Sequence, residues 1–445
     1  MGAIFHMIWI ILICMQELVP IWIVISIKGR QDIYMRKLGY KLRLMLPKIG
    51  PAFVKLAQFI STREDLIHPI ICEELKLLQD QAPKIHFSKL EKILKQELRQ
   101  LYGELAIEFE AIAAASVAQV HRGTIIVNNK RIKVAIKILK PNIRKKFQKN
   151  LDLLFLIAKF LNTFISSARR LRLMEVVNVI SDTATAELNM QTEAAAADKL
   201  RYNFSSYHCI YIPKVFWQYT TKSILVTEWI DGVKINGSYN FNKKEIGKKL
   251  AFAFFQQIYV DGFFHADIHP GNILINTHGQ IVLLDFGMFS YLPEKDRLLL
   301  AQIIYAFVKK DYEKVADLHF KAGYIKGDMQ KTRNRFAMAC RTIAEPIFDR
   351  PTSDIAISKL LRRLFEVTSE FNMHTQPQLL LLQKNMVALE GVLHNLDSNL
   401  NMWQLVEPWF VDWAEQNLNI AATFKRKILC LMDYLQALED TMHDH

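Results

Sequence analysis

Two short segments of the sequence carry side chains suited to handling phosphate and metal ions. The first, HADIHPGN at 265–272, contains Asp267 and Asn272 five residues apart, and the second, LLDFG, ends a later apolar run with Asp285. A carboxylate such as Asp285 can bind Mg²⁺, an amide oxygen such as that of Asn272 can supply a second ligand, and Asp267 can orient or deprotonate a hydroxyl group or water. We expect His265 to brace the loop.

The order of these segments is more specific than either segment alone. DFG by itself is a common turn, and HPGN is a Pro-Gly loop with an asparagine that can cap it. HxDxxxxN, then two strand-like runs joined by a turn, and then DFG is the order typical of kinase catalytic sites. The pattern therefore predicts a kinase-like site for phosphoryl transfer.

A lysine upstream fits the same chemistry. The segment KVAIKIL places Lys137 in the centre of an expected strand, as in the V-A-I-K pattern of a phosphate-holding lysine. Alternation puts Lys137 on the face of Ala135 and Leu139, so we expect it on the buried side, where it needs a carboxylate. Glu193 on a following helix is the candidate. Glu187 lies six residues earlier, about 120° away around a helix of ~3.6 residues per turn, so the two carboxylates could serve two different lysines.

The expected phosphate loop lacks its usual glycine. Glycine lets a backbone approach phosphate closely, but the turn at 113–121 reads AAASVAQVH, and the next glycine is Gly123. Compared with glycine, alanine allows fewer backbone conformations in this turn, which changes how the turn can hold phosphates.

The elements that position these side chains follow from the period of the apolar residues. The first part of the chain has helical spacing over 31–102, then three strands over 107–140 joined by an Ala-rich turn and an Asn-Asn turn, and helical spacing again over 141–206. Two further strands, KVFWQY and SILVTEW, come next, followed by a helix over about 243–260. The last part has two strands, ILIN and IVLL, around a THGQ turn, and is helical from 294 onward. A small β-rich unit followed by a helical unit predicts two lobes with a cleft at residues 229–232.

Composition narrows the class of protein. At 445 residues the chain is too long for one ordinary core, and a hydrophobic content of 51% excludes a disordered chain. Five cysteines without a CxxC pair fit a reducing compartment and argue against disulfide or thiolate metal sites. A formal net charge of +13 suits nucleotide phosphate or an anionic membrane face. Without a basic-aromatic array or zinc-knuckle spacing, we expect no nucleic-acid partner, and each short basic group reads most simply as a solvated helix face.

The N-terminus leaves two interpretations open. Residues 3–27 are mostly apolar, but a single membrane span would bury Glu17, at a cost of about 2.5–3.5 kcal/mol, beside Pro20. Split at that point, each half is too short to cross a bilayer. The segment is therefore either an amphipathic or buried helix or a genuine span, and in both cases Lys28 and Arg30 would stay on the cytoplasmic side.

Taken together, these segments resemble a known family, the UbiB family of atypical kinase-like proteins (ADCK-like proteins), which support ubiquinone biosynthesis. The resemblance covers roughly residues 30–415. Its marks are GPAFVKLAQFISTREDL at 50–66, ELKLLQDQAP at 74–83, AAASVAQVH at 113–121, VAIKILKP at 134–141, ELNMQTEAA at 187–195, HADIHPGN at 265–272, LLDFG at 283–287 and LLLQKNMVALEGVLHNLD at 380–397. The Ala-rich turn is itself a feature of this family.

The resemblance implies an α+β fold, namely a bilobal protein-kinase-like fold with a β-rich N-lobe, a helical C-lobe and an N-terminal helical extension over the cleft. The implied regions are a hydrophobic, membrane-associated or amphipathic segment at 1–30, the helical extension with a KxxQ motif at 31–106, an N-lobe with a helical insertion at 107–230, and a helical C-lobe with the catalytic loop and DFG at 231–445.

The resemblance also implies roles for individual residues. Lys55 and Gln58 match the family's KxGQ motif, and Lys55 would pair with Glu187. Lys137 would pair with Glu193. The turn of Ala113, Ala114, Ala115, Ser116 and Val117 would cover the phosphates, and Glu228 to Ile230 would form the lobe hinge near the adenine. Asp267 would be the catalytic-loop aspartate, and Asn272 and Asp285 would be Mg²⁺ ligands.

Three features depart from the family pattern. Ala57 stands at the glycine of KxGQ, and Asn189 stands at the second acid of the family's ExD motif, which removes a carboxylate near the cleft. Bacterial members usually end in hydrophobic spans, whereas this chain reaches residue 445 with an amphipathic stretch. We therefore expect membrane attachment through the N-terminal segment, basic helices or partners.

Three functions are compatible with the sequence. The first is an ATP- and Mg²⁺-dependent ATPase or small-molecule or lipid phosphotransferase required for ubiquinone biosynthesis, at the cytoplasmic face of the inner membrane, with membrane lipids, quinone precursors and quinone-biosynthesis proteins as partners. The second is a small-molecule kinase of the aminoglycoside-phosphotransferase type, which would lack the KxxQ helix. The third is a nucleotide-gated, non-catalytic scaffold. Because only MFSYLPEKDR separates DFG from the next helix, no activation segment is expected to dock a peptide substrate.

Overall fold

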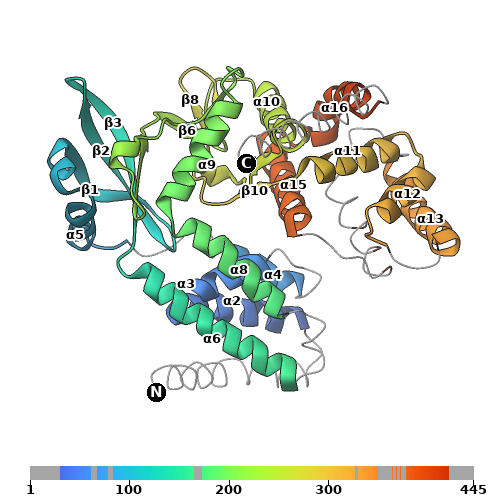
Figure 1. Ribbon diagram of the computed structural model, residues 1–445, viewed down its shortest axis with the longest axis horizontal. Coiled ribbons are helices and arrows are strands. Elements are labelled where there is room, and N and C mark those ends of the chain that lie inside the picture. Colours follow the sequence, from blue (N-terminus) through green and yellow to red (C-terminus); the bar gives the residue numbers. More distant parts are fainter. Residues whose placement is uncertain are drawn as a thin grey trace, which may run out of the picture. The chain divides into compact units, whose positions relative to one another are not determined.

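A computed structural model describes residues 31–61, 68–78, 84–164, 173–325, 329–348, 363, 367, 371 and 377–419 (Figure 1). The chain forms two compact units. Unit 1 comprises residues 1–202, 212–230 and 285–288, and unit 2 comprises residues 203–211, 231–284 and 289–445. The expected apolar segment at 3–27 and the tail beyond Asn419 lie outside the described residues. In the part of the chain that is described, no helix combines the length and apolarity needed to cross a membrane.

Unit 1 contains a four-stranded antiparallel sheet in the order β1-β2-β3-β5. Its strands are β1 (Leu105–Ala114), β2 (Ala118–Val127), β3 (Lys130–Leu139) and β5 (Ile224–Glu228). Asn128 and Asn129 adopt φ angles of 50° and 58° between β2 and β3, which is the left-handed geometry that a tight two-residue hairpin requires and that asparagine tolerates. The Asn-Asn turn predicted from the sequence is confirmed.

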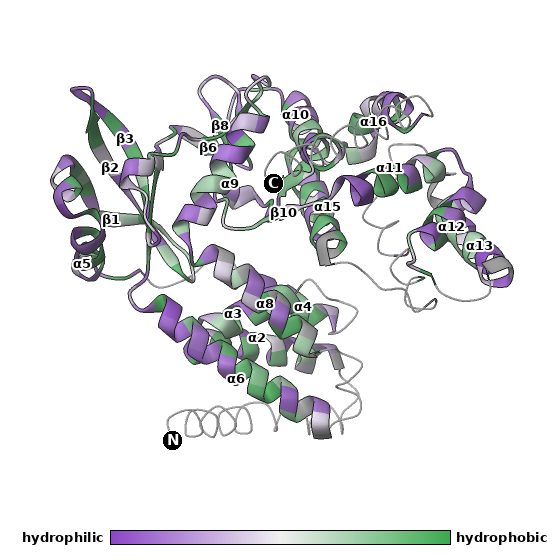
Figure 2. Cartoon of the chain, in the orientation of Figure 1, coloured by the Kyte–Doolittle hydropathy of each residue, from purple (hydrophilic) through white to green (hydrophobic). Residues whose placement is uncertain are grey.

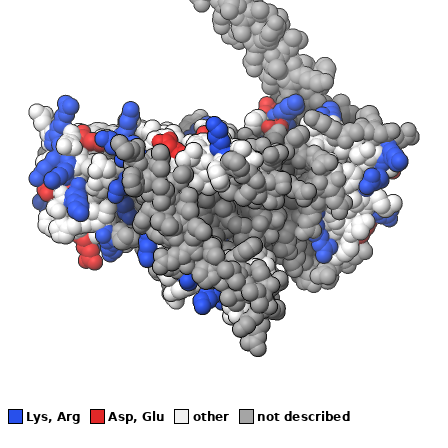
Figure 3. All heavy atoms as spheres, turned by 90° about the horizontal axis from the view of Figure 1, so that it is seen from below, with Lys and Arg blue, Asp and Glu red and all other residues white. Residues whose placement is uncertain are grey.

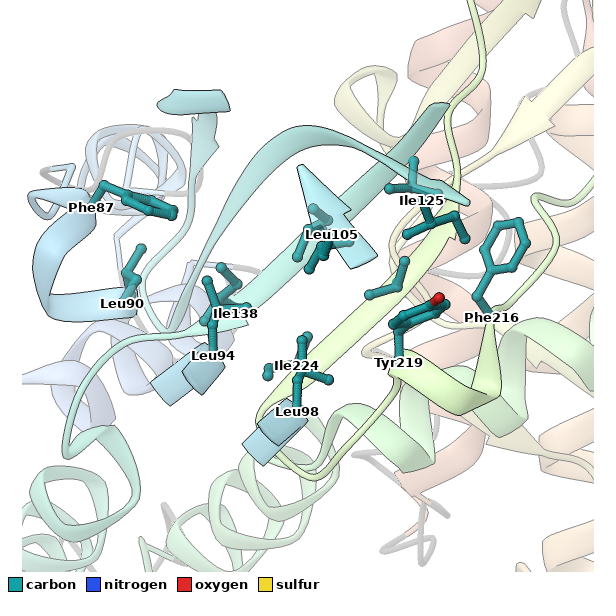
Figure 4. Packing of buried hydrophobic residues seen from close by; sticks show 13 residues of the cluster. Phe87, Leu90, Leu94, Leu98, Leu105, Ile125, Ile138, Phe216, Tyr219 and Ile224 are labelled. Carbon is teal, nitrogen blue, oxygen red and sulfur yellow. The ribbon is translucent and has the colours of Figure 1, made fainter. Parts of the chain in front are cut away.

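One face of this sheet carries the core of unit 1. Val134, Ile136 and Ile138 alternate along β3 and are completely buried. They pack with leucines from α5 (Phe87–Leu98), and Figure 4 shows Leu90, Leu94 and Leu98 beside Ile138 and Ile224. A short 3₁₀ helix, η1 (Arg99–Glu104), links α5 to β1. The period of two along β3 and the helical spacing of the leucines bring these faces together.

The second part of unit 1 is helical, and within the described ranges its helices are α2 (Gln31–Ile49), α3 (Pro51–Ile60), α4 (Pro69–Lys76), α6 (Ile143–Phe164) and α8 (Leu173–Glu187). In Figure 1 they lie together, and α3 contacts α2, α4, α6 and α8. Figure 2 shows α6 hydrophilic at its start and more hydrophobic further along. Between α2 and α3, Gly50 has a φ of 149° and Pro51 begins the next helix, so the chain can turn sharply there.

One strand predicted in unit 1 is wrong. After α9 (Met190–Asn203), the segment KVFWQY forms only the isolated bridge Val215–Thr227 and then the 3₁₀ helix η2 (Trp217–Tyr219). Tyr219 is completely buried in the sheet core, and its hydroxyl donates to Glu104 at 2.6 Å. The aromatic residues that suggested a strand are explained by this burial, because β-propensity largely measures how well a side chain packs.

Among its described residues, unit 2 has two small sheets. The first, in the order β4-β9-β8-β6, comprises β4 (Ile210–Tyr211), β6 (Gly232–Lys234), β8 (Ile273–Asn276) and β9 (Ile281–Leu283). The predicted ILIN and IVLL hairpin is present as β8 and β9. The second sheet pairs β7 (Phe263–His265) with β10 (Phe289–Tyr291), and neither strand was expected. Each has only three residues and, unlike β9, does not follow a neighbouring strand through a short turn.

The rest of unit 2 is helical within the described ranges. The helices are α10 (Lys243–Gln256), the π-helical turn η3 (Gln257–Asp261), the 3₁₀ helix η4 (Pro270–Asn272), α11 (Glu294–Val308), α12 (Tyr312–Lys321), α13 (Met329–Phe348), α15 (Pro377–Leu396) and α16 (Met402–Leu418). Between Gly287 and Glu294 the chain forms only β10 and a short connection. Aromatic rings of Phe255, Tyr259 and Phe410 pack at centroid distances of 5.1–5.8 Å and join α10 and η3 to α16.

In Figure 3, the lysines and arginines that the structure describes lie in several separate groups, with acidic and uncharged residues beside them. Such dispersed lysines and arginines are typical of solvated helix faces.

Candidate functional site

Lys137 in unit 1 joins two carboxylates. Its Nζ lies 2.8 Å from Glu193 Oε1 on α9 and 2.7 Å from Asp285 Oδ1. The Lys137 side chain lies on the face of β3 opposite the core residues Val134, Ile136 and Ile138. It is nevertheless only 16% exposed, because the carboxylates cover it.

Burial and charge oppose each other in this group. Burial alone lowers the pKa of the Lys137 ammonium, but the carboxylates of Asp285 and Glu193 outweigh it, and the net shift is upward. Burial raises the pKa of Glu193 to about 7, against the opposing effect of Lys137 and with the help of Asp285. Glu193 Oε2 is fully buried without a hydrogen-bond partner among the residues that the structure describes. The group therefore places one lysine between two acids.

A second ion pair in unit 1 joins Lys55 to Glu187. Lys55 lies on α3, and Glu187 is the last residue of α8. The two side chains are 15% and 10% exposed. Both lysines thus contact the carboxylate expected from the sequence. Gln58, one turn after Lys55, is partly exposed, and its carbonyl accepts from Ser61 Oγ at 2.7 Å.

Gly287 lies where the two ion pairs meet. A Cβ atom there would be 3.3 Å from Asp285 Oδ1, 3.6 Å from Glu193 Oε2 and 3.6 Å from Glu187 Cγ. The three acidic side chains therefore border one position of the DFG segment. Such a cluster repels itself unless cations neutralise it, and Lys55 and Lys137 supply two of them.

Two departures from the family pattern have local explanations. Ala57 is buried against Ile71 and Leu75, so its methyl group fills a packing position between α3 and α4. Asn189 precedes α9, and its side-chain oxygen accepts from the Gln191 N–H at 3.2 Å. Asparagine and aspartate cap helices about equally well, so the missing carboxylate leaves the start of α9 stabilised.

The Ala-rich turn joins β1 to β2. Ala113 and Ala115 are exposed, Ala114 and Ser116 are partly exposed, and Val117 is buried. The turn is tied internally, because the Ala115 N–H donates to Ala118 O and the Lys140 N–H donates to Val117 O, both at 2.9 Å. At the expected hinge, Glu228 ends β5, and the following Trp229 N–H donates to Lys133 O at 3.1 Å.

The catalytic-loop residues lie in unit 2, where His265 braces the loop. His265 is 2% exposed; its Nδ1 accepts from the Asp267 N–H at 3.0 Å, and its Nε2 lies 3.1 Å from Leu284 O. Since Nδ1 accepts, Nε2 must carry the proton that Leu284 O receives. The expected bracing role matches this geometry.

Asn272 connects two parts of the loop region within unit 2. Its side-chain Nδ2 donates to the backbone oxygen of Asp267 at 3.2 Å, and its backbone carbonyl accepts from the Leu284 N–H at 2.9 Å. Because Nδ2 is used in this way, Oδ1 is the side-chain atom suited to a cation. Asp285 follows Leu284 directly along the chain and adopts a left-handed φ of 56°.

A pair of residues missed by the sequence reasoning also contacts this loop. Lys384 Nζ on α15 lies 2.8 Å from Asp267 Oδ1, and the neighbouring Asn385 bonds to the loop backbone. The available signal was a lysine and an asparagine inside the long apolar run LLLQKNMVALEGVL. Spacing alone could not connect them to residues 117 positions earlier.

The donor set fits Mg²⁺ and nucleotide phosphate in chemistry. Each expected metal ligand carries an oxygen donor: Asp285 in unit 1 has a carboxylate and Asn272 in unit 2 has an amide oxygen, and Mg²⁺ prefers oxygen ligands of these kinds. Within the described residues, no group of three or more His, Cys, Asp or Glu side chains is arranged to hold a metal by itself.

Family models match most of the chain. The ABC1 atypical kinase-like domain matches residues 77–319, and the UbiB helical domain matches residues 340–401. Proteins described as "Probable protein kinase UbiB" are similar over most of their length. The protein of Marinobacter nauticus is 38% identical over 87% of this chain and 72% of its own, and the protein of Pseudomonas putida is 36% identical over 87% and 73%.

A solved structure supports the fold. A Mycobacterium tuberculosis protein in complex with erythromycin aligns with a TM-score of 0.56 at 22% identity, covering 79% of this chain and 90% of that one. Together with the family match, this confirms the expected α+β, kinase-like fold.

Proposed function

The chain belongs to the UbiB family of atypical kinase-like proteins, and on that basis we propose that it binds ATP with Mg²⁺ and either hydrolyses it or transfers phosphate to a small molecule or lipid. The observation that carries the proposal is the contact of Lys137 with both Glu193 and Asp285. A lysine buried between two acids is arranged to hold phosphate oxygens beside a metal ligand.

Each side chain has a defined task in this proposal. Bound Mg²⁺ would neutralise phosphate oxygens. Asn272 and Asp285 would hold the ion, Lys137 would orient the nucleotide, and Asp267 would accept a hydrogen bond from the attacking hydroxyl or water. The turn Ala113–Val117 would cover the phosphates, with Glu228 near the adenine.

The Lys55–Glu187 pair supports a role for the KxxQ helix. It links α3 to the end of α8, whose Glu187 borders Gly287 of the DFG segment. We propose that Lys55 and Gln58 restrict what reaches the nucleotide. Together with the short connection after Gly287, this favours a small acceptor over a peptide.

The biological setting belongs to the same proposal. Family membership favours a role in ubiquinone biosynthesis at the cytoplasmic face of the inner membrane. The expected partners are membrane lipids, quinone precursors and other quinone-biosynthesis proteins, and the net charge of +13 is compatible with an anionic surface.

Phosphate release from ATP tests the proposal. The purified chain would be assayed with Mg²⁺, with and without anionic vesicles and phenolic lipid precursors, beside Asp267→Asn. We expect Mg²⁺-dependent release that falls at least about 100-fold in the variant, the usual scale for a positioned acid or base. Tight ATP binding with no release under every condition would instead support the non-catalytic scaffold.

A further inference from the structure

Asn385 on α15 holds the backbone on both sides of Asp267. Its Nδ2 donates to His265 O at 3.1 Å, and its Oδ1 accepts from the Ile268 N–H at 3.1 Å. The orientation of the amide follows from these partners, since a carbonyl needs a donor and an N–H needs an acceptor. Asn385 is completely buried, so loss of either bond would leave a buried polar group unpaired.

Lys384, the preceding residue, contacts the Asp267 side chain itself. Its Nζ lies 2.8 Å from Asp267 Oδ1, while His269 Nε2 lies 3.8 Å from Oδ2. The Lys384 and Asp267 side chains are 24% and 32% exposed, which shields the pair more than an open surface pair. A charge-assisted bond of this length restricts the rotation of the carboxylate.

The helix that carries both residues is firmly anchored. Leu389 and Leu393 on α15 are completely buried, and Met386 is 3% exposed. Lys384 and Asn385 are therefore presented from a packed helix, which positions side chains more accurately than a loop does.

We propose that α15 completes the catalytic loop, with Lys384 as a positioning residue that holds the Asp267 carboxylate in one orientation and Asn385 as the brace of its backbone. This rests on the proposed function of Asp267. The kinase-like family model ends at residue 319, whereas both residues lie in the segment matched by the UbiB helical domain. The helical domain is then a working part of the phosphoryl-transfer site.

The role has a specific kinetic consequence. Each carboxylate oxygen has more than one acceptor position, so an Asp267 held by Lys384 can still accept from a hydroxyl or water. Fixing its orientation raises the fraction of bound complexes in a reactive geometry. Removal of Lys384 should therefore lower kcat and leave nucleotide affinity nearly unchanged.

The test compares Lys384→Met, Lys384→Arg and the charge-matched control Lys321→Met, at an exposed position at the end of α12. We expect Lys384→Met to lower kcat by about 10- to 100-fold, with the Kd for Mg²⁺-ATP changed by less than about threefold. Lys384→Arg keeps the charge and should restore most of kcat. Lys321→Met should behave as the parent.

A double-mutant comparison separates this inference from the proposed function. The shift in denaturant midpoint that Lys384→Met causes is measured both in the parent and in the Asp267→Asn background. In the Asp267→Asn background this shift should largely disappear. Equal shifts in both backgrounds, or a kcat that Lys384→Met leaves unchanged while Asp267→Asn is inactive, would overturn the inference. Full activity of Asp267→Asn would instead contradict the proposed function, whatever Lys384 does.

Discussion

The Lys137 ammonium lies 2.7 Å from Asp285 Oδ1, although 148 residues separate them along the chain. In the proposed function Asp285 is also the Mg²⁺ ligand, so one carboxylate would serve both Lys137 and the metal. A cation bound at Asp285 would reduce its attraction to Lys137 and release the ammonium towards phosphate, because a divalent ion dominates its local electrostatics.

Asp285→Asn tests the metal assignment. An amide keeps the shape but loses the charge that holds Mg²⁺, so we expect the Mg²⁺-dependent part of the ATP-induced rise in Tm to disappear. Differential scanning fluorimetry with ATP, with and without Mg²⁺, provides the measurement. Asp182→Asn, at an exposed position on α8 in the same unit, should keep the full Mg²⁺ effect. An undiminished effect in Asp285→Asn would reject Asp285 as a ligand.

Lys137→Met should destabilise the protein in a pH-dependent way. Glu193 is 2% exposed, and removing its cation leaves a buried charge, at a cost of about 3–5 kcal/mol. The pKa of Glu193 is already raised to about 7, mainly by burial, and loss of Lys137 raises it further. As pH falls, protonation of Glu193 therefore reduces the destabilisation caused by Lys137→Met. Urea unfolding at pH 6 and pH 8 should show the larger loss at pH 8, and adding Glu193→Gln should remove that difference.

Lys55→Ala should alter ATP turnover and loosen α3. Loss of the ammonium leaves Glu187, with 10% of its side chain exposed, without this partner, at a cost of about 1–3 kcal/mol. Steady-state ATPase kinetics and thermal unfolding would be compared with Lys48→Ala, an exposed lysine at the end of α2. Kinetics identical to the parent would reduce the KxxQ helix to a packing element.

Gly50→Ala should destabilise the turn between α2 and α3. A Cβ at Gly50 would lie 2.1 Å from Asn150 Oδ1 on α6, and the φ of 149° is unfavourable for alanine. We expect a loss of about 1–3 kcal/mol in denaturant unfolding. Gly103→Ala is the matched control, because its added methyl group meets nothing within 4 Å. Equal stability of the two variants would show that the turn adapts.

His319 should make unit 2 sensitive to acid. Burial lowers its pKa to about 4, while its Nδ1 lies 2.7 Å from Val315 O. The unfolded chain therefore binds the proton first, and stability present above about pH 6.5 is lost as pH falls towards 4, by about 3 kcal/mol in total. His319→Leu should flatten this part of the stability curve relative to the parent. His394→Leu, at an exposed position on α15, should leave the slope unchanged.

The sequence by itself determined the features that depend on neighbouring residues. The Asn-Asn turn, the β8–β9 hairpin and the order HxDxxxxN before DFG are local, because turn geometry and apolar period act over a few residues. Lys137 and its need for a carboxylate could be predicted for the same reason. The strands β7 and β10 could not be predicted, and the aromatic segment 214–219 gave a false strand because packing overrode local preference.

Only the tertiary structure decided which distant side chains meet. The Asp267–Lys384 contact spans 117 residues, and nothing in the period of α15 distinguishes a lysine that faces the loop from one in water. The same holds for the meeting of Glu187, Glu193 and Asp285 around Gly287. Side-chain types and local spacing define what chemistry a chain can perform, whereas the contacts that neutralise and orient those groups arise only when separate elements pack.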